Sequence, residues 1–484
     1  MAGSLFSVRL TLQEQEGRCV LDSMNDLLKS AGRLGWATSL LGVRHLNELL
    51  ISPPSSSQGA GIQHTEVQSA SRRKRDVDGL LGEMASGVYN VSRRVQQQTT
   101  ALISDIFSGD GLTPRLAVRT LFQIMQDSAG IVELITPHHD GQIAWRELQN
   151  KLQSFYLFEH VDSVLSISGR AEPSLPELLD RASRLGPFFS VWATEGLGHY
   201  YSDWHLSHGS LPDQLLSGPR APYLPPASLI PLHAGLGLSF VESLLRATDK
   251  GQLDAAAVVS TLIQFCHNNV QRGFQGEVWE ALGLAARNLY PHLVAAIDLL
   301  LSRIDSALQA YFWHGVGRAI YFAPTNFLPF RNAPWKAVQM CLVEPSHSLG
   351  KRNALAGFSW ALTLVNLRNP EVMATFLKHH WKDIVHSDAF ANGVCSAIVV
   401  WHDSAPSDDD LDAFYRYEPP KSDPSLIDLW HKYVTQTRND ALRYHRVLAK
   451  HNALGEIFRY RNLPDFIRTL ECTSQHFKPS VADA

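Results

Sequence analysis

The sequence predicts an all-α fold, and three features of the 484-residue chain support this prediction. Apolar residues recur at helical spacing along most of the chain, whereas the alternating pattern of a β-strand is scarce. Six short segments rich in Gly, Ala and Ser share one layout and follow one another at intervals of 34 to 46 residues. Intervals of this length are typical of stacked helical units. We therefore expect a helical-repeat domain of stacked helix pairs with small-residue motifs, preceded by a helical N-terminal region.

The six small-residue segments are best aligned on their second small residue. This alignment places the following positions in register: Gly198, Gly237, Gly283, Gly317, Ser359 and Cys395. Five segments also carry two small residues four positions apart, on one face of a helix: Gly235 and Ser239, Ala281 and Ala285, Gly315 and Ala319, Gly357 and Ala361, Gly393 and Ala397. Each glycine lowers the stability of a helix by about 1 kcal/mol relative to alanine. Glycine nevertheless recurs on the same helix face in these segments, which indicates that neighbouring helix backbones approach closely.

Composition and boundaries divide the chain into four parts. Residues 1–50 read as an N-terminal helical segment, and residues 51–79, rich in Pro, Ser, Gly and Gln, as a linker or mobile loop. Residues 80–170 are a second helical region, and residues 174–484 hold the six segments. The length of the chain agrees with more than one structural unit, since single cores rarely exceed about 250–300 residues.

Charge and cysteine content exclude several classes of protein. There are 43 basic and 47 acidic side chains, which argues against a dedicated nucleic-acid binder. The five cysteines form no CxxC pair, so neither a disulfide framework nor a zinc site is indicated. No signal peptide and no uninterrupted apolar run of about 18 residues is evident. We expect a cytoplasmic protein without a transmembrane segment.

One segment in the second helical region is spaced like a calcium-binding loop. If Thr136 is position 1, then Asp140, Gly141 and Glu147 fall at positions 5, 6 and 12, which supply a ligand, the sharp turn and the bidentate glutamate. Positions 1 and 3 are Thr136 and His138, however, where the motif requires carboxylates or Asn. A metal-free EF-hand-like turn, a chance match and a weak calcium site with Asp140 and Glu147 as ligands all remain open.

Six ionisable residues lie in or beside the small-residue segments, on helix faces that must pack inward: Glu195, His199, His233, Glu280, His314 and Arg318. Burying such groups is unfavourable unless they are paired or functional. One interpretation is a central cavity where they act as catalytic acid, base and anchoring cation. The other is that they form hydrogen bonds and ion pairs that hold neighbouring helices in register. His314 and Arg318 are one turn apart, so Arg318 could anchor a carboxylate or thioester oxygen while His314 or Glu195 moves a proton.

The order of the six segments resembles that of a bacterial family of unknown function associated with enediyne polyketide gene clusters. The matching segments are EGLG at 195–198, AGLG at 234–237, EALG at 280–283, GVGRAIYF at 315–322, AGFS at 356–359 and NG at 392–393. The chain departs from the family at Glu280-Ala281, where the family favours Asp-Gly, and at Ala285, where it often shows histidine. No counterpart is identified for the N-terminal part of the chain.

The resemblance implies a role in natural-product biosynthesis, with the linear polyene precursor of an enediyne as substrate class. We expect a protein that binds or modifies a hydrophobic polyketide or polyene intermediate within its helical domain. The alternative is a non-catalytic α-helical repeat scaffold whose partner is another protein. The sequence leaves open whether the protein is an enzyme and which cofactor, if any, it uses.

Overall fold

The computed structural model describes residues 139–476, except residues 168–171, 209–212, 220, 324–332, 386 and 407. Every regular element in this part of the chain is helical, and no strand occurs in it, which confirms the all-α prediction. The residues from Ile143 onwards form one compact unit. The expected segments 1–50 and 51–79, and most of 80–170, lie outside the described residues.

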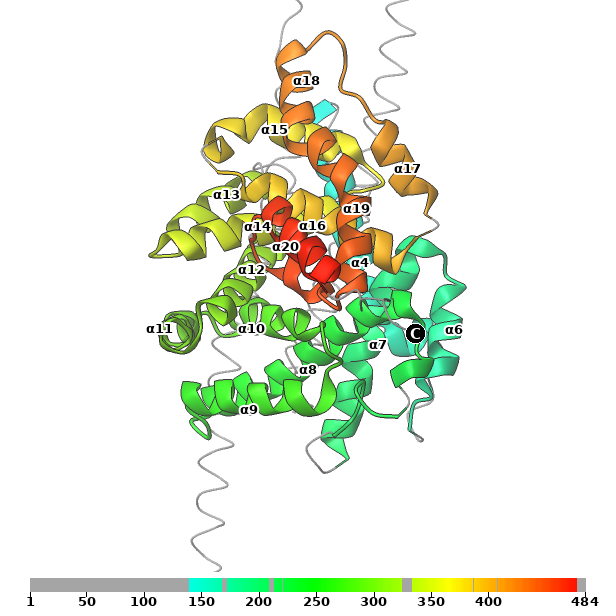
Figure 1. The fold of residues 1–484 in the computed structure, drawn as a ribbon, viewed down its shortest axis with the longest axis vertical. Coiled ribbons are helices and arrows are strands. Elements are labelled where there is room, and N and C mark those ends of the chain that lie inside the picture. The colour runs from blue at the N-terminus through cyan, green and yellow to red at the C-terminus, as the bar shows by residue number, and fades with distance from the viewer. Residues whose placement is uncertain are drawn as a thin grey trace, which may run out of the picture. The chain divides into compact units, whose positions relative to one another are not determined.

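Six helices carry the small-residue segments, and we refer to them as the motif helices: α7 (Pro187–Ser207), α8 (Leu229–Asp249), α10 (Gln275–Leu289), α12 (Ser306–Phe322), α14 (Ser348–Val365) and α16 (Ala389–Ser404). Each motif helix packs against the next one in this order. Figure 1 shows α8, α10, α12, α14 and α16 as neighbours in a continuous row. Helix α16, the last of the series, also contacts α8, the second.

The remaining helices surround or extend this series. Four of them alternate with the motif helices along the chain: α9 (Ala255–Asn269), α11 (Val294–Ile304), α13 (Ala333–Val343) and α15 (Pro370–Ile384). The others are α4 (His139–Glu159), α5 (Val161–Val164), α6 (Leu175–Ser183), α17 (Asp409–Arg416), α18 (Pro424–Trp430), α19 (Gln436–Lys450) and α20 (Leu463–His476), with a 3₁₀ turn, η6 (Leu454–Phe458), before α20. The alternation fits the expected helix pairs; their origin as repeats stays a prediction.

Glycines allow the motif helices to touch through their backbones. A methyl group added at Gly283 of α10 would lie 1.8 Å from the carbonyl oxygen of Phe312 in α12. Conversely, a methyl group added at Gly315 of α12 would lie 1.9 Å from the carbonyl oxygen of Glu280 in α10. Contacts of the same kind join α7 to α8 and α12 to α14. The prediction that the small residues permit close backbone approach is therefore confirmed at these glycines.

Helix α4 replaces the calcium-loop-like turn expected from the sequence. Asp140 and Glu147 both lie within this helix, so they do not form a loop that could wrap around an ion. The Glu147 carboxylate instead forms a buried ion pair of 2.7 Å with the Lys151 ammonium, which also lies 3.9 Å from the ring centre of Tyr321 in α12. The expected turn is thus wrong, because the chain from His139 onwards is helical; Glu147 pairs with Lys151, which packs on Tyr321 and so docks α4. Thr136 and His138 lie outside the described residues.

The docking of α4 also shifts the expected domain boundary. The side-chain amide of Asn150 in α4 donates to the side-chain oxygens of Asn366 and Asn369, at 3.0 Å and 2.8 Å. Asn366 follows the last residue of α14 and donates to the Tyr321 hydroxyl at 2.9 Å. A helix that we assigned to the preceding region is therefore part of the compact unit, which begins at Ile143 and not at residue 174.

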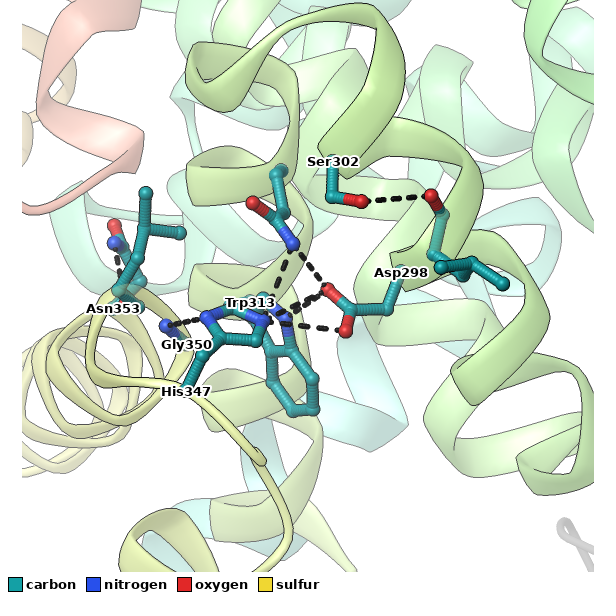
Figure 2. A network of polar contacts seen from close by, with 9 residues as sticks. Asp298, Ser302, Trp313, His347, Gly350 and Asn353 are labelled. Carbon is teal, nitrogen blue, oxygen red and sulfur yellow. Dashed lines mark hydrogen bonds and ion pairs between the residues drawn. The ribbon is translucent and has the colours of Figure 1, made fainter.

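A polar network secures α11 and the start of α14 against α12. One carboxylate oxygen of Asp298 in α11 accepts from the Trp313 indole at 2.6 Å and from the Gln309 amide at 2.8 Å. His347 is the N-cap of α14; its Nδ1 accepts from the backbone N–H of Gly350 at 3.0 Å, and its Nε2 lies 3.2 Å from Asp298. Figure 2 shows the His347 ring between these two partners. Because every member is partnered locally, we interpret this network as structural.

Helix α8, with the short turn before it, is the one described segment that is long and apolar enough to cross a membrane. It spans Pro226–Asp249, and 78 % of its most apolar window is buried inside the protein. This burial is what a core helix of a soluble protein shows. The apolar character of α8 is thus explained by its place between α7 and α10.

Replacing Gly283 by Ala tests the backbone contact between α10 and α12. The added methyl group would collide with a backbone carbonyl that cannot move without its helix, so we expect a loss of about 1–3 kcal/mol in the free energy of unfolding. An unconstrained helical glycine would give the opposite sign, a gain of up to about 1 kcal/mol. Chemical denaturation of both proteins measures the difference. Gln264→Ala, on the exposed face of α9, is the control for helix propensity alone.

Candidate functional site

Four of the six ionisable residues selected from the sequence meet in the interior. Arg318 of α12 donates to the Glu195 carboxylate of α7, and its other terminal nitrogen lies 3.1 Å from Oε2 of Glu280 in α10. The remaining oxygen of Glu280 lies 3.0 Å from Nδ1 of His314. We call these four residues the Arg318 network. All of them are buried, and Glu280 and His314 have no exposed surface.

The packing of the motif helices positions this network directly. The backbone carbonyl oxygen of Glu195 lies where a side chain at Gly235 would begin, and that of Glu280 lies in the same relation to Gly315. The carbonyl oxygen of His314 lies against Gly357 in the same way. The three residues are thus anchored at the points where neighbouring helices are closest. This arrangement explains why side chains from three helices meet within hydrogen-bonding distance.

Electrostatics favour the charged forms of Glu280 and Arg318. Burial alone would raise the pKa of Glu280, but the adjacent Arg318 guanidinium and the hydrogen bond from His314 lower it below its ordinary value. Burial alone would lower the pKa of Arg318, but the carboxylates of Glu195 and Glu280 outweigh this effect and raise it. The pair Arg318–Glu280 is therefore charged at neutral pH, and its charges compensate each other.

His314 has one ring nitrogen engaged and one free. Its Nδ1 bonds to the ionised Glu280, so Nδ1 carries the proton and Nε2 carries the lone pair in the neutral imidazole. Nε2 is buried and has no hydrogen-bond partner among the described residues. The rings of Trp360 and Phe458 lie 6.1 Å and 6.4 Å from the imidazole, so its surroundings are aromatic. A carboxylate that orients an imidazole whose other nitrogen is free is the arrangement of a general base.

A further carboxyl group, Glu277, lies beside the network and was not selected from the sequence. It precedes Glu280 by three residues on α10, so the two side chains are neighbours on one helix face. Glu277 has no exposed surface, and neither of its oxygens has a hydrogen-bond partner within the described range. Burial raises its pKa well above the ordinary value; the backbone N–H of Glu277 itself offsets part of this rise, and the negative charges of Glu280 and Asp403 add to it. The i, i+3 spacing to Glu280 was the signal that could have revealed it.

The structure does not bring His199 and His233 into this network. Nε2 of His199 lies 3.2 Å from the carboxylate of Glu242 in α8. Nδ1 of His233 donates to the backbone carbonyl of Leu229 at 2.7 Å, and its Nε2 accepts from the backbone N–H of Gln271 at 3.1 Å. Burial lowers the pKa of His233 to about 4, so it is neutral at physiological pH. Both ring nitrogens of His233 are therefore engaged by backbone groups, and the side chain joins α8 to the segment at Gln271.

The described residues offer little for metal or thiol chemistry. They contain no group of three or more His, Cys, Asp or Glu side chains placed to hold a metal ion. Cys266, Cys341, Cys395 and Cys472 are free thiols. Burial raises the pKa of the Cys266 thiol to about 12, which leaves it protonated and a poor nucleophile. The Arg318 network and Glu277 are therefore the candidate site.

Comparison of the chain with models of protein families, with curated proteins and with solved structures finds no match. The resemblance to the enediyne-associated family thus stays an expectation based on the six motifs. What the site can do follows from its geometry: it holds one charged, compensated pair, one oriented imidazole and one carboxyl group without a partner.

Replacing Arg318 by Met tests how strongly the network holds the helices. The variant keeps most of the packed stem but leaves Glu195 and Glu280 buried without their cation, so we expect a loss of about 3–5 kcal/mol in the free energy of unfolding. Arg287→Met is the matched control, because Arg287 pairs with Glu344 near the surface, where an ion pair contributes about 0–1 kcal/mol. Denaturant titration compares the two. A loss at Arg318 no larger than at Arg287 would contradict the buried network.

Replacing Glu277 by Gln tests whether this carboxyl is protonated. A carboxyl whose pKa is raised by folding holds its proton more tightly in the folded state, so its contribution to stability falls as pH rises above the unfolded value of about 4.3. Gln cannot titrate. We therefore expect the Tm of Glu277→Gln, relative to the wild type, to increase between about pH 5 and pH 8, as measured by thermal circular dichroism. A difference that does not change with pH would show an ordinary, ionised Glu277.

Proposed function

We propose that this protein is an enzyme that binds a hydrophobic small molecule in its helical unit and catalyses a proton transfer. The single observation that carries the proposal is the Glu280–His314 pair, in which the ionised carboxylate bonds to Nδ1 and leaves Nε2 buried and without a partner. His314 acts as the general base. General acid–base catalysis of this kind contributes about 10²- to 10⁴-fold to a rate.

The other members of the network support His314. Glu280 fixes the tautomer of the imidazole and stabilises the imidazolium that forms when Nε2 takes a proton. Arg318 keeps Glu280 ionised, and Glu195 provides the second anion that balances the guanidinium.

The surroundings of His314 favour a hydrophobic substrate. The rings of Trp360 and Phe458 flank the imidazole, and the Arg318 guanidinium lies 5.0 Å from the Trp360 ring centre. Aromatic walls with few convergent polar groups are typical of sites for apolar ligands. With the resemblance of the motifs, this supports a polyketide or polyene intermediate of an enediyne-type pathway as the substrate. The free thiols of the described cysteines agree with action in the cytoplasm.

A test of this proposal measures proton transfer directly. The purified protein is incubated in D₂O with the N-acetylcysteamine thioester of a β,γ-unsaturated octenoic acid, and deuterium in the recovered probe is measured by mass spectrometry. We expect exchange by the wild type and a fall of about 10²- to 10⁴-fold in His314→Gln. His292→Gln is the matched control, because His292 is exposed, between α10 and α11.

Two results would contradict the proposal. A folded His314→Gln protein that exchanges as fast as the wild type would exclude His314 as the base. A wild type that exchanges no deuterium would favour the alternative expected from the sequence, a non-catalytic scaffold in which the Arg318 network only holds the helices in register. Circular dichroism of each variant shows that the fold is retained.

A further inference from the structure

Two carboxyl groups on one face of α10 have opposite environments. Glu280 meets a guanidinium and an imidazole, at 3.1 Å and 3.0 Å, and its pKa is lowered. Glu277, one turn earlier, meets neither, and both of its oxygens are buried without a hydrogen-bond partner in the described part of the chain. The surroundings thus favour the ionised form of Glu280, which orients His314, and the protonated form of Glu277.

The groups that surround Glu277 give it no counter-charge. The charged side chains that act on it are both acidic, Glu280 on its own helix and Asp403 on α16, and Asp403 is paired with His445. The two other titratable groups coupled to it are the Tyr311 phenol and the Cys266 thiol, which burial keeps protonated. A carboxylate placed here would be desolvated and repelled, so the neutral acid is the stable form.

The turn η6 covers Glu277 and His314 together. A methyl group added at Gly455 of η6 would lie 3.0 Å from Oε2 of Glu277, and the Phe458 ring of the same turn lies 6.4 Å from the His314 ring. Glu277 is thus placed on the side of α10 that faces the same covering element as the imidazole. A neutral carboxyl group offers one O–H donor, and no acceptor for it is found in the described residues. A carbonyl oxygen of a substrate is one group that can accept such a hydrogen bond.

We propose that Glu277 is the catalytic acid that acts with His314, and that the substrate is an unsaturated carbonyl compound whose double bond the site moves. This inference rests on the proposed function, because it takes His314 as the base. The inference goes beyond the proposed function by naming the acid, the substrate class and the reaction. The reaction is an isomerisation between β,γ- and α,β-unsaturated ketones or thioesters.

The reaction balances without a cofactor. His314 Nε2 removes a proton from the carbon next to the carbonyl, and the electrons of that C–H bond form a new carbon–carbon double bond. The carbonyl π electrons move to oxygen, which takes the proton of Glu277, so that a dienol, an imidazolium and a carboxylate are present. The imidazolium then returns its proton to the far carbon of the dienol, while the Glu277 carboxylate takes back the hydroxyl proton. The products are the isomer and the original enzyme, and neither an oxidant nor a reductant is consumed.

The experiment uses the full-length protein and the same β,γ-unsaturated octenoyl thioester. Isomerisation is followed by the ultraviolet absorbance of the conjugated product. We expect Glu277→Gln, which keeps the shape of the side chain, to fold normally and to lose about 10²- to 10⁴-fold in rate. Glu344→Gln, which removes a carboxyl at the Arg287 ion pair near the surface, is the matched control and keeps the wild-type rate.

A second measurement reports the protonation state without any substrate. Infrared spectroscopy of the wild type at neutral pH is expected to show the C=O stretching band of a protonated carboxyl group that is missing in Glu277→Gln. A spectrum identical in both proteins would overturn the assignment of Glu277 as the acid, as would a Glu277→Gln rate within two-fold of the wild type.

The outcomes separate this inference from the proposed function. If His314→Gln abolishes deuterium exchange while Glu277→Gln retains isomerisation, His314 remains the base and the role of Glu277 is wrong. If the wild type neither exchanges nor isomerises the probe, the proposed function fails and the isomerisation fails with it. We expect both variants to lose both activities, and the infrared band to be present in the wild type.

Discussion

The contact on which the structure depends is that of a backbone carbonyl with a glycine of the next motif helix. It occurs at Glu195 against Gly235, at Glu280 against Gly315, and again one helix further along. At these points no side chain separates the two backbones, so the side chains that leave the contact residues are forced into one shared volume. The small residues therefore determine both how closely the helices pack and which ionisable side chains meet.

This close approach has an electrostatic consequence. Three helices that touch through their backbones place Glu195, Glu280 and Arg318 within direct contact and exclude water from all three. Charges in such a place persist only as a compensated set, because an unpaired ion would lose its hydration without replacement. Arg318 gives Glu195 and Glu280 a shared counter-charge, whereas the charged groups that act on Glu277 are acidic. The same packing thus lowers the pKa of one carboxyl group and raises that of another one turn away on the same helix.

The sequence predicted more of the helix packing than of the site. Small residues one turn apart have one physical meaning, close contact, so the fold class and the approach at Gly283 and Gly315 could be inferred from spacing alone. The partner of a buried polar group depends on tertiary structure. His233, for example, bonds to the backbone of Gln271, whose position in the fold no local pattern reveals. Glu147 was misassigned for a similar reason, since its partner Lys151 is equally consistent with an exposed helix.

Glu277 was missed because it lies outside the six segments, although its i, i+3 spacing to Glu280 was a local signal. Arg318 and Glu277 therefore differ in how much each contributes to holding the helices together. Arg318 bridges α7, α10 and α12, so its contribution to holding the helices cannot be removed without disturbing the imidazole. Neither carboxyl oxygen of Glu277 has a hydrogen-bond partner in the described structure, so Gln at this position breaks no contact between helices. This lack of a structural contact at a buried acid is what motivates the proposal that Glu277 acts in catalysis.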